Sequence, residues 1–352
     1  MKWVWKAGKK LSVLLAAVFL AVMLLSCAQR EAGSQTQAEM EYPKEAVEMI
    51  APAGRGGGFD LTIRAVSQCL ISSGLVFVPL PVTNKPGNGG SAALEYLAKK
   101  RGSDTVLSIF SPPICLIHLN GTTPYNYKDN TTPVAKLLVD YGCFAVRSDS
   151  PYESIGDVME ALKADPTCLK VGGTSSVWSM DHVQFLVMAK AAGVEHLDQI
   201  PYEGYENGGA ASQLMGGRID VLSAGISDVM GLLESGDLRV LAVTSEERME
   251  NGLMAEVPTC REEGIDQVFS NWRGLFGPED MPDYALSYWE ETLEKMVHTK
   301  EWQEYCEQYG WTMDYLGHEE FETFLDETNE EYRQLLEEVR GMHDKRMNVF
   351  FN

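Results

Sequence analysis

The sequence is poor in basic residues. Its 352 residues include 29 lysines and arginines against 51 aspartates and glutamates, so the formal net charge is −22. Nucleic acids and anionic lipid surfaces are unfavourable partners for such a chain. A small anionic ligand is also repelled at long range, but salt confines this repulsion to roughly 8 Å, within which backbone N–H groups can outweigh it.

Several catalytic and metal-binding motifs are also missing. The sequence has no Gly-x-Ser-x-Gly, no His-Glu-x-x-His, no glycine loop that ends in Gly-Lys-Ser/Thr, and no partner spacing among its six histidines. Six cysteines follow Cys27 without any Cys-x-x-Cys spacing: Cys69, Cys115, Cys143, Cys168, Cys260 and Cys306. We therefore expect neither an enzyme nor a metal or cofactor site, and we expect most of these cysteines to be buried free thiols.

Long hydrophobic runs are absent except at the N-terminus. Four lysines precede an apolar run from Leu11 to Leu25, which ends at Ser26-Cys27. The run is shorter than the roughly 20 residues of a membrane span, and its end resembles a bacterial lipobox. Residues 1–26 are therefore predicted to be a lipoprotein signal peptide, and Cys27 to carry the lipid. Residues 27–43 then form a flexible tether at the outer face of the cytoplasmic membrane, in the periplasm or at the cell surface.

Short apolar runs alternate with helical patterns through the remaining chain. The runs predicted as strands include 46–51, 75–82, 105–110, 134–139, 143–146 and 197–201, and helices such as 59–71 and 180–192 lie between them. This alternation is typical of an α/β fold with largely parallel sheets. We expect two lobes, 44–143 plus 259–352 and 144–258, which are joined by two crossovers and enclose a cleft. Hinged clefts of this kind close around ligands.

A glycine-rich loop follows the first predicted strand and opens onto a helix. Glycines let the backbone approach a ligand closely, and the N–H groups at a helix start can converge on an anion. We expect the loop residues Arg55, Gly56, Gly57, Gly58 and Phe59 to contact the ligand, the N–H groups of the last three being the donors. Asp60 fits a helix cap that also orients a water molecule. The alternative is an ordinary turn.

Other polar residues follow predicted strands or begin helices, where pocket residues gather in open α/β sheets. The candidates for ligand contact are Ser111, Thr174, Ser175, Ser176, Asp181 and Tyr202. The hydroxyls can donate to a carboxylate, but they can equally cap helices and close local turns. Asp181 and its neighbour His182 fit either a pair behind the ligand-contacting residues or a satisfied helix start.

A set of ordered segments points to one family. They are Ala51-Pro52-Ala53 with Gly56-Gly57-Gly58-Phe59-Asp60, Asn84-Lys85-Pro86-Gly87, Asp181-His182, Pro201-Tyr202, Gly216-Gly217-Arg218-Ile219-Asp220, Leu241 to Ser245, Val257-Pro258-Thr259 and Asn271-Trp272-Arg273-Gly274. With these segments the mature chain resembles the solute-binding component of a tripartite tricarboxylate transporter, the group that includes the Bug proteins.

The resemblance implies a fold and a function. It implies a two-lobe, periplasmic-binding-protein-like (Venus flytrap) receptor that binds a small carboxylate and delivers it to a permease of large and small membrane subunits. The glycine-loop and tryptophan motifs look most like those of the citrate-type branch. The loops 56–60 and 174–176 would then grip the ligand from opposite lobes. We expect a monomer without a cofactor. The alternatives are a carboxylate sensor that acts through a signalling partner and a hydrolytic enzyme.

Overall fold

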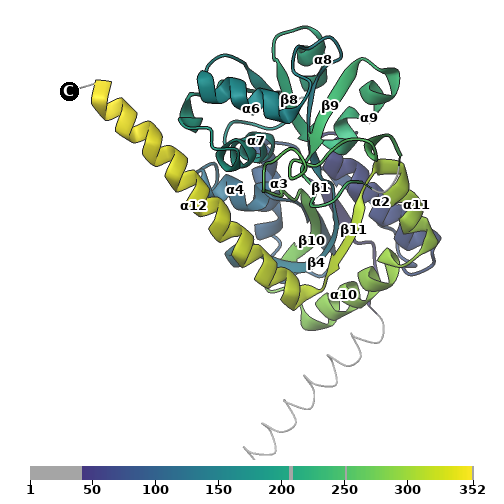
Figure 1. The fold of residues 1–352 in the computed structure, drawn as a ribbon. Coiled ribbons are helices and arrows are strands. Elements are labelled where there is room, and N and C mark those ends of the chain that lie inside the picture. The colour runs from purple at the N-terminus through teal and green to yellow at the C-terminus, as the bar shows by residue number, and fades with distance from the viewer. Residues whose placement is uncertain (1–41, 206–208, 250–251, 351–352) are drawn as a thin grey trace, which may run out of the picture.

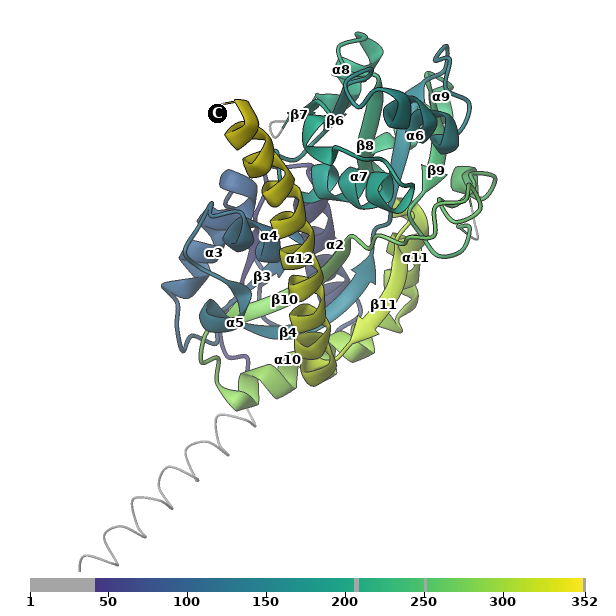
Figure 2. The ribbon, with the colours of Figure 1, turned by 60° about the vertical axis from the view of Figure 1, so that its left-hand side comes forward.

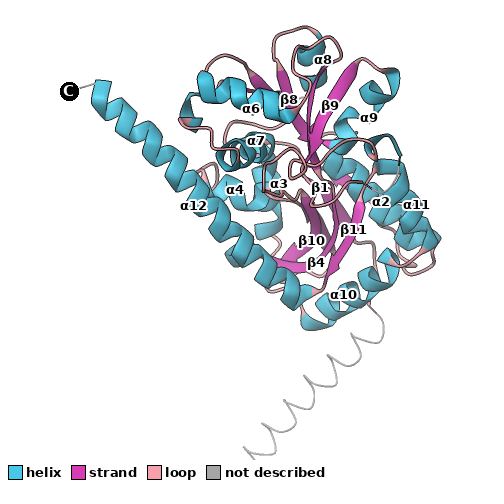
Figure 3. Cartoon of the chain, viewed as in Figure 1, coloured by secondary structure: helices cyan, strands magenta, loops and turns pink. Residues whose placement is uncertain are grey.

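The protein folds into two lobes, each built around one β-sheet (Figure 1). The structure is a computed structural model that describes residues 42–205, 209–249 and 252–350, and for 339–350 only the backbone. The predicted signal peptide, the lipidated Cys27 and most of the tether lie outside the described residues. Figure 3 separates the strands of the two sheets from the helices that cover them.

The first sheet has six strands in the order β11-β4-β10-β3-β1-β2. Their bounds are β1 Glu48–Ala51, β2 Val82–Asn84, β3 Val106–Phe110, β4 Thr131–Val139, β10 Trp272–Pro278 and β11 Thr312–Leu316. Strand β1 pairs in parallel with β2 and β3, whereas β10 runs antiparallel to both β3 and β4.

The second sheet has five strands in the order β7-β6-β8-β5-β9. Their bounds are β5 Gly142–Arg147, β6 Val171–Gly173, β7 Tyr202–Gly204, β8 Val221–Gly225 and β9 Leu238–Val243. The chain crosses from the first sheet to the second between Val139 and Gly142 and returns between Val243 and Trp272. The expectation of largely parallel sheets is wrong, because the returning strand β10 enters from the second lobe and so runs against β3.

Helices cover both sheets. In the first lobe they are α2 Gly58–Ser72, η1 Asn88–Gly90, α3 Ser91–Ala98, α4 Pro113–Leu119, α5 Tyr127–Asn130, α10 Asp283–Val297 and α11 Lys300–Tyr309. In the second they are α6 Ile155–Ala164, α7 Met180–Ala191, η2 Leu197–Gln199, α8 Ala210–Met215, α9 Ile226–Ser235 and η3 Gly252–Met254. The predicted helices 59–71 and 180–192 are confirmed to within one residue.

Two predicted strands are wrong, and proline is the reason in both. Residues 75–81 form a loop, and β2 begins only after Pro81. In the run 197–201 the first three residues form η2, and strand β7 begins after Pro201. Proline has no N–H to donate to a ladder, so a strand interior rarely tolerates it.

The hydrophobic core is continuous between the lobes. One cluster of buried side chains contains Phe110 and Phe276 of the first lobe together with Phe144 and Phe185 of the second. Two further clusters lie within single lobes, one around Trp289 in the first and one around Leu222 in the second. The lobes therefore share packed side chains as well as two connecting segments.

The last helix, α12 (His318–Phe350), runs beside both lobes (Figure 2). Its first part contacts the first lobe, where Asp326 accepts a hydrogen bond from Tyr127. Further along, Glu338 forms an ion pair with Lys190 of α7 in the second lobe. The helix thus straps the lobes together on one side.

Five of the six cysteines in the described part of the chain are buried, Cys168 is exposed, and all six are free thiols. Within the same residues, no helix combines the length and the apolar character needed to cross a membrane.

Candidate functional site

The glycine loop joins β1 to α2 at the end of the sheet that faces the second lobe. Gly57 is the residue before the helix and has extended backbone angles, φ −76° and ψ 162°. Gly56 has φ +83°, a left-handed conformation that favours glycine. The Cβ position of Gly54 has no neighbour within 4 Å, so only part of the loop requires glycine.

Asp60 organises this loop. Its Oδ2 accepts the N–H of Gly56 at 2.9 Å, and its Oδ1 accepts Nε of Arg64 at 2.9 Å and Nδ2 of Asn84 at 2.7 Å. Burial alone would raise the pKa of Asp60, but these hydrogen bonds outweigh it and hold the pKa below its usual value. The carboxylate of Asp60 is therefore ionised. Asp60 is the third residue of α2, and its hydrogen bonds connect the start of this helix to the loop at Gly56 and to β2 at Asn84.

Three backbone N–H groups at the start of α2 remain available. The N–H of Gly57 donates to the carbonyl of Gly54 at 3.3 Å. By contrast, no acceptor within the described ranges takes the N–H of Gly58, Phe59 or Asp60. The first N–H groups of a helix have no intrahelical partner, so they are ready donors to an anion. The available set is shifted by one residue from the expected Gly57, Gly58 and Phe59.

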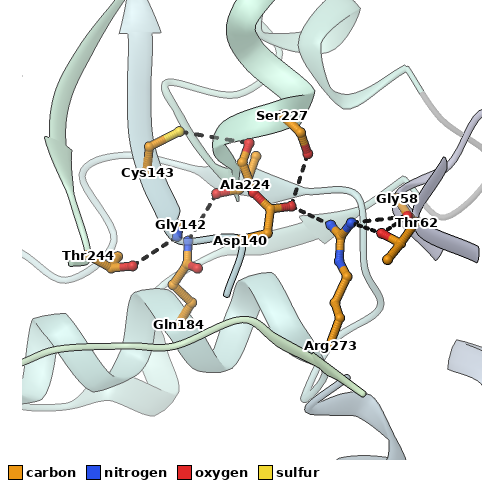
Figure 4. Close-up of polar contacts among 11 residues, drawn as sticks. Gly58, Thr62, Asp140, Gly142, Cys143, Gln184, Ala224, Ser227, Thr244 and Arg273 are labelled. Carbon is orange, nitrogen blue, oxygen red and sulfur yellow. Dashed lines mark hydrogen bonds and ion pairs between the residues drawn. The ribbon is translucent and has the colours of Figure 1, made fainter. Parts of the chain in front are cut away.

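A buried ion pair links this helix start to the second lobe (Figure 4). Arg273 of β10 pairs with Asp140, which lies between β4 and β5, and both side chains are almost fully buried. The guanidinium also donates to the carbonyl of Gly58 at 3.1 Å and to Thr62. On the other side, Ser227 of α9 donates to Asp140 at 3.0 Å. We call these five residues the interlobe junction.

The start of α9 repeats the arrangement at the start of α2. Gly225 precedes the helix, and Asp228 is its third residue, with a carboxylate oxygen 3.4 Å from the Cβ position of Gly225. Burial raises the pKa of Asp228 to about 7, and the negative charges of Asp140 and Asp181 add to the rise while Arg273 opposes it. Asp228 is nevertheless an exposed residue, so solvent screens these charges and limits the rise.

In the second lobe, Asp181 at the start of α7 gathers the expected hydroxyl loop. Its Oδ2 accepts the N–H of Thr174 at 2.7 Å, the hydroxyl of Thr174 at 2.9 Å and the N–H of Ser175 at 3.0 Å. Tyr202 donates to the carbonyl of Ser175 at 2.8 Å. The structure therefore brings Thr174, Ser175, Asp181 and Tyr202 together, but these groups largely satisfy one another. The hydroxyl of Ser176 has no hydrogen-bond partner in the described part of the chain.

His182 packs against the same loop. Its Nδ1 accepts the N–H of Trp178 at 3.0 Å, and its ring stacks on Tyr202 at 4.3 Å between centroids. Burial lowers the pKa of His182 to about 4, so the ring is neutral at pH 7. Its Nε2 is buried and finds no partner among the described residues.

The lobes also meet at the rim of this loop. Trp178 has φ +64°, which is uncommon for a bulky residue, and its carbonyl accepts Nδ2 of Asn120 from the first lobe at 3.4 Å. The hydroxyl of Ser179 lies 3.9 Å from the Cβ position of Gly89. Within the described residues, no hydrogen bond joins the loops 54–60 and 174–176 directly.

The two remaining candidates differ in their surroundings. Ser111 follows β3 and is buried, with no hydrogen bond to its hydroxyl within the described ranges. Because β1 and β3 are parallel neighbours, Ser111 lies at the same sheet end as the glycine loop. Arg55 is exposed, and no described residue accepts from its guanidinium.

Four residues of this region are not among the predicted site residues: Asp140, Ser227, Asp228 and Arg273. The sequence signal for Arg273 is its place in the motif Asn271-Trp272-Arg273-Gly274, which contributes to the family resemblance. Asp140 and Ser227 carry no local signature, because their roles arise from contacts between distant segments.

The residues present also limit the chemistry of the site. No group of three or more His, Cys, Asp and Glu side chains in residues 42–205, 209–249 and 252–350 could hold a metal ion. The site combines backbone N–H groups, several hydroxyls and the carboxyl groups of Asp60, Asp140, Asp181 and Asp228 at a place where the two lobes meet. Such a site can bind and release a ligand.

Comparisons with known proteins agree with this architecture. Protein BugT of Bordetella pertussis is 28% identical over 246 residues, which cover 68% of this chain and 72% of BugT. A protein of R. palustris solved with adipate has 20% identity and a TM-score of 0.75, and the match covers 85% of this chain and 98% of that one. MatC from Rhodopseudomonas palustris, solved with malate, has 18% identity and a TM-score of 0.71, with 84% and 99% covered.

The likeness to the two solved structures shows the fold, whereas a family model identifies the chain. The model described as "Tripartite tricarboxylate transporter family receptor" matches residues 73–341, which is most of the sequence. This protein therefore belongs to the tripartite tricarboxylate transporter receptor family.

Proposed function

We propose that this protein is an extracytoplasmic solute-binding receptor that captures a small carboxylate between its lobes and delivers it to a membrane permease. Membership of the receptor family supports the class of function. Two structural neighbours were solved with malate and adipate, both of which are carboxylates. We further propose citrate or a similar polycarboxylate as the ligand, and a lipid on Cys27 that anchors the protein as a monomer outside the cytoplasmic membrane.

The observation that carries the proposal is the row of available N–H groups at Gly58, Phe59 and Asp60, beside the interlobe junction. Backbone donors bind a carboxylate without the desolvation cost of a buried free cation. Arg273 is not such a free cation, because Asp140 neutralises it. Its role is to hold the start of α2 against the second lobe, so that the donors face the space between the lobes.

The hydroxyls supply further donors. Ser111 lies at the same sheet end as the glycine loop, and Ser176 belongs to the loop that Asp181 organises. We assign these two hydroxyls to direct ligand contact, and Thr174, Ser175, Asp181 and Tyr202 to holding the second-lobe loop in shape. Selectivity then depends on how many carboxylate oxygens find donors, since an unmatched buried donor costs about 1–3 kcal/mol.

A ligand panel tests this function. Residues 28–352, which omit the predicted lipidation site, are titrated by calorimetry with citrate, malate, adipate, neutral amides of the same size, amino acids and aromatic acids. We expect binding of at least one di- or tricarboxylate and no binding of its neutral amide. Binding confined to neutral ligands would contradict the proposal.

A further inference from the structure

One loop of the first lobe exposes an aromatic side chain almost completely. Phe77 has 91% of its surface exposed, and Ile71 nearby has 42%. Phe77 lies in the loop 73–81, between α2 and β2, where the sequence pattern predicted a strand. The side chains of its neighbours Val76 and Leu80 are buried, with only 2% and 9% of their surface exposed. These two side chains anchor the loop to the core, while Phe77 points outward.

The same segment is free of charge. No Asp, Glu, Lys or Arg occurs between Ala65 and Asn84, although the whole chain contains 80 charged residues (29 basic and 51 acidic). Phe77 and Ile71 are two of the six large apolar side chains that are exposed in the described part of the chain, and Phe77 is by far the most exposed of them. The loop itself therefore presents no like charge to a lipid surface, and the negative charge of Glu301 beside this segment faces Cys69 of α2.

The loop lies at the end of the sheet remote from the ligand site. Strands β1 and β2 are parallel, and Ala51, which leads into the glycine loop, is paired with Asn84 at the end of β2. The loop 73–81 precedes Val82 at the beginning of β2. Phe77 therefore lies at the opposite end of the first lobe from the proposed ligand site.

The loop also lies beside the point where the tether meets the folded protein. Tyr42 packs edge-on against Tyr288 with 5.2 Å between ring centroids and accepts Nε1 of Trp289 at 2.6 Å. The hydroxyl of Tyr288 in turn donates to the carbonyl of Leu75 at 3.5 Å. Residues 27–41, which lie outside the described residues, precede Tyr42; as the predicted flexible tether, a chain of this length would span roughly 20 Å on average. A lipid on Cys27 would thus hold this face near the bilayer.

We propose that the loop 73–81 rests on the lipid bilayer, with the ring of Phe77 inserted at the membrane interface. This inference rests on the proposed lipid anchor. One exposed aromatic side chain binds lipid weakly by itself, but the tether keeps it at high local concentration. In this resting orientation the ligand site points away from the membrane, and the protein must reorient on its tether to deliver the ligand.

Photo-crosslinking tests the contact. The mature chain from Cys27 onward, carrying Cys168→Ser to remove the exposed thiol, is coupled through Cys27 to a maleimide lipid in phosphatidylcholine vesicles. Benzoylphenylalanine replaces Phe77 in one variant. In the control variant it replaces Val177, which is 46% exposed and belongs to the other lobe. We expect lipid adducts at position 77 to exceed those at position 177 at least fivefold, and equal yields would overturn the inference.

A second arm uses cell membranes that contain the natural lipoprotein. A lipid adduct at position 77 supports the inference, and an adduct to a membrane protein in its place overturns it in favour of a protein docking surface. The mass of the N-terminal peptide from the same membranes shows separately whether Cys27 carries lipid. An unmodified Cys27 would contradict the proposed lipid anchor but not the membrane contact of the loop. The maleimide-coupled protein tests that contact without natural lipidation.

Discussion

A methyl group on Gly58 would lie 2.8 Å from Nη2 of Arg273, the nitrogen that pairs with Asp140. The absence of a side chain at the start of α2 thus allows the buried ion pair to form against the helix. The ligand donors proposed above and the contact between the lobes depend on the same few atoms.

The first prediction concerns this close approach. Gly58→Ala should displace the guanidinium of Arg273, destabilise the protein by about 1–3 kcal/mol, and weaken carboxylate binding at least about tenfold. Urea unfolding and calorimetry measure the two effects. Gly54→Ala is the matched control, because the Cβ position of Gly54 has no neighbour within 4 Å. Equal stability and equal carboxylate affinity of the two variants would show that the close approach of Gly58 and Arg273 contributes to neither property.

The second prediction concerns the ion pair itself. Asp140→Asn leaves Arg273 as an uncompensated buried charge, so we expect a loss of about 3–5 kcal/mol in the free energy of unfolding. Arg273→Met should cost a similar amount for the converse reason. The double variant should cost clearly less than the sum of the two, since neither charge remains. Additive losses in urea unfolding would contradict a direct pair.

The third prediction concerns pH and ligand affinity. The pKa of Asp228 is raised, so its carboxyl group titrates closer to neutral pH than that of a free aspartate and gains negative charge as the pH rises. Affinity for a dicarboxylate that stays fully ionised should therefore fall as the pH rises from 6 to 8. Calorimetry at several pH values measures the slope. Asp228→Asn should flatten the slope and raise affinity at pH 8, and an unchanged slope would place Asp228 away from the ligand.

The fourth prediction concerns acid stability. Burial lowers the pKa of His182 to about 4 in the folded protein from 6.5 when unfolded, so the unfolded chain binds the proton more readily. The stability due to this neutral ring is complete above pH 6.5 and is lost as the pH falls toward 4, by up to about 3 kcal/mol. Urea unfolding at pH 6.5 and 4.5 should show a smaller difference for His182→Gln than for the unsubstituted protein.

The unsubstituted protein is the necessary reference in that measurement. Several carboxylates, including Asp60 and Asp326, have lowered pKa values and also lose stabilising contacts in acid. Only the difference between the two proteins reports on His182. Equal losses in the free energy of unfolding of the two proteins would contradict the assignment of this acid effect to His182.

Local patterns were sufficient for much of the secondary structure. The helix after the glycine loop was predicted as 59–71 and is found as Gly58–Ser72. Its position follows from the apolar spacing of the helix and the glycines that precede it, which are short-range features. The strand predicted for 75–82 is wrong, because its apolar residues suggest a strand whereas Pro79 and Pro81 cannot complete a ladder.

The candidate site was predictable only in part. The sequence predicts the glycine loop and the loop that Asp181 organises as candidates, because glycine, hydroxyl and helix-start signals are local. The hydrogen bonds that occupy Thr174 and Ser175 were not predictable, since a residue type does not reveal whether its donors are already used within the fold.

The sequence by itself determined the α/β class, the main helices, the acidic character and the family resemblance, because these depend on composition, periodicity and short motifs. The tertiary structure decided that Arg273 and Asp140 neutralise each other, that three N–H groups of α2 stay available, and that Phe77 lies outside the core. The reason is physical: burial, pairing of charges and satisfaction of donors are set by neighbours that are distant in the chain.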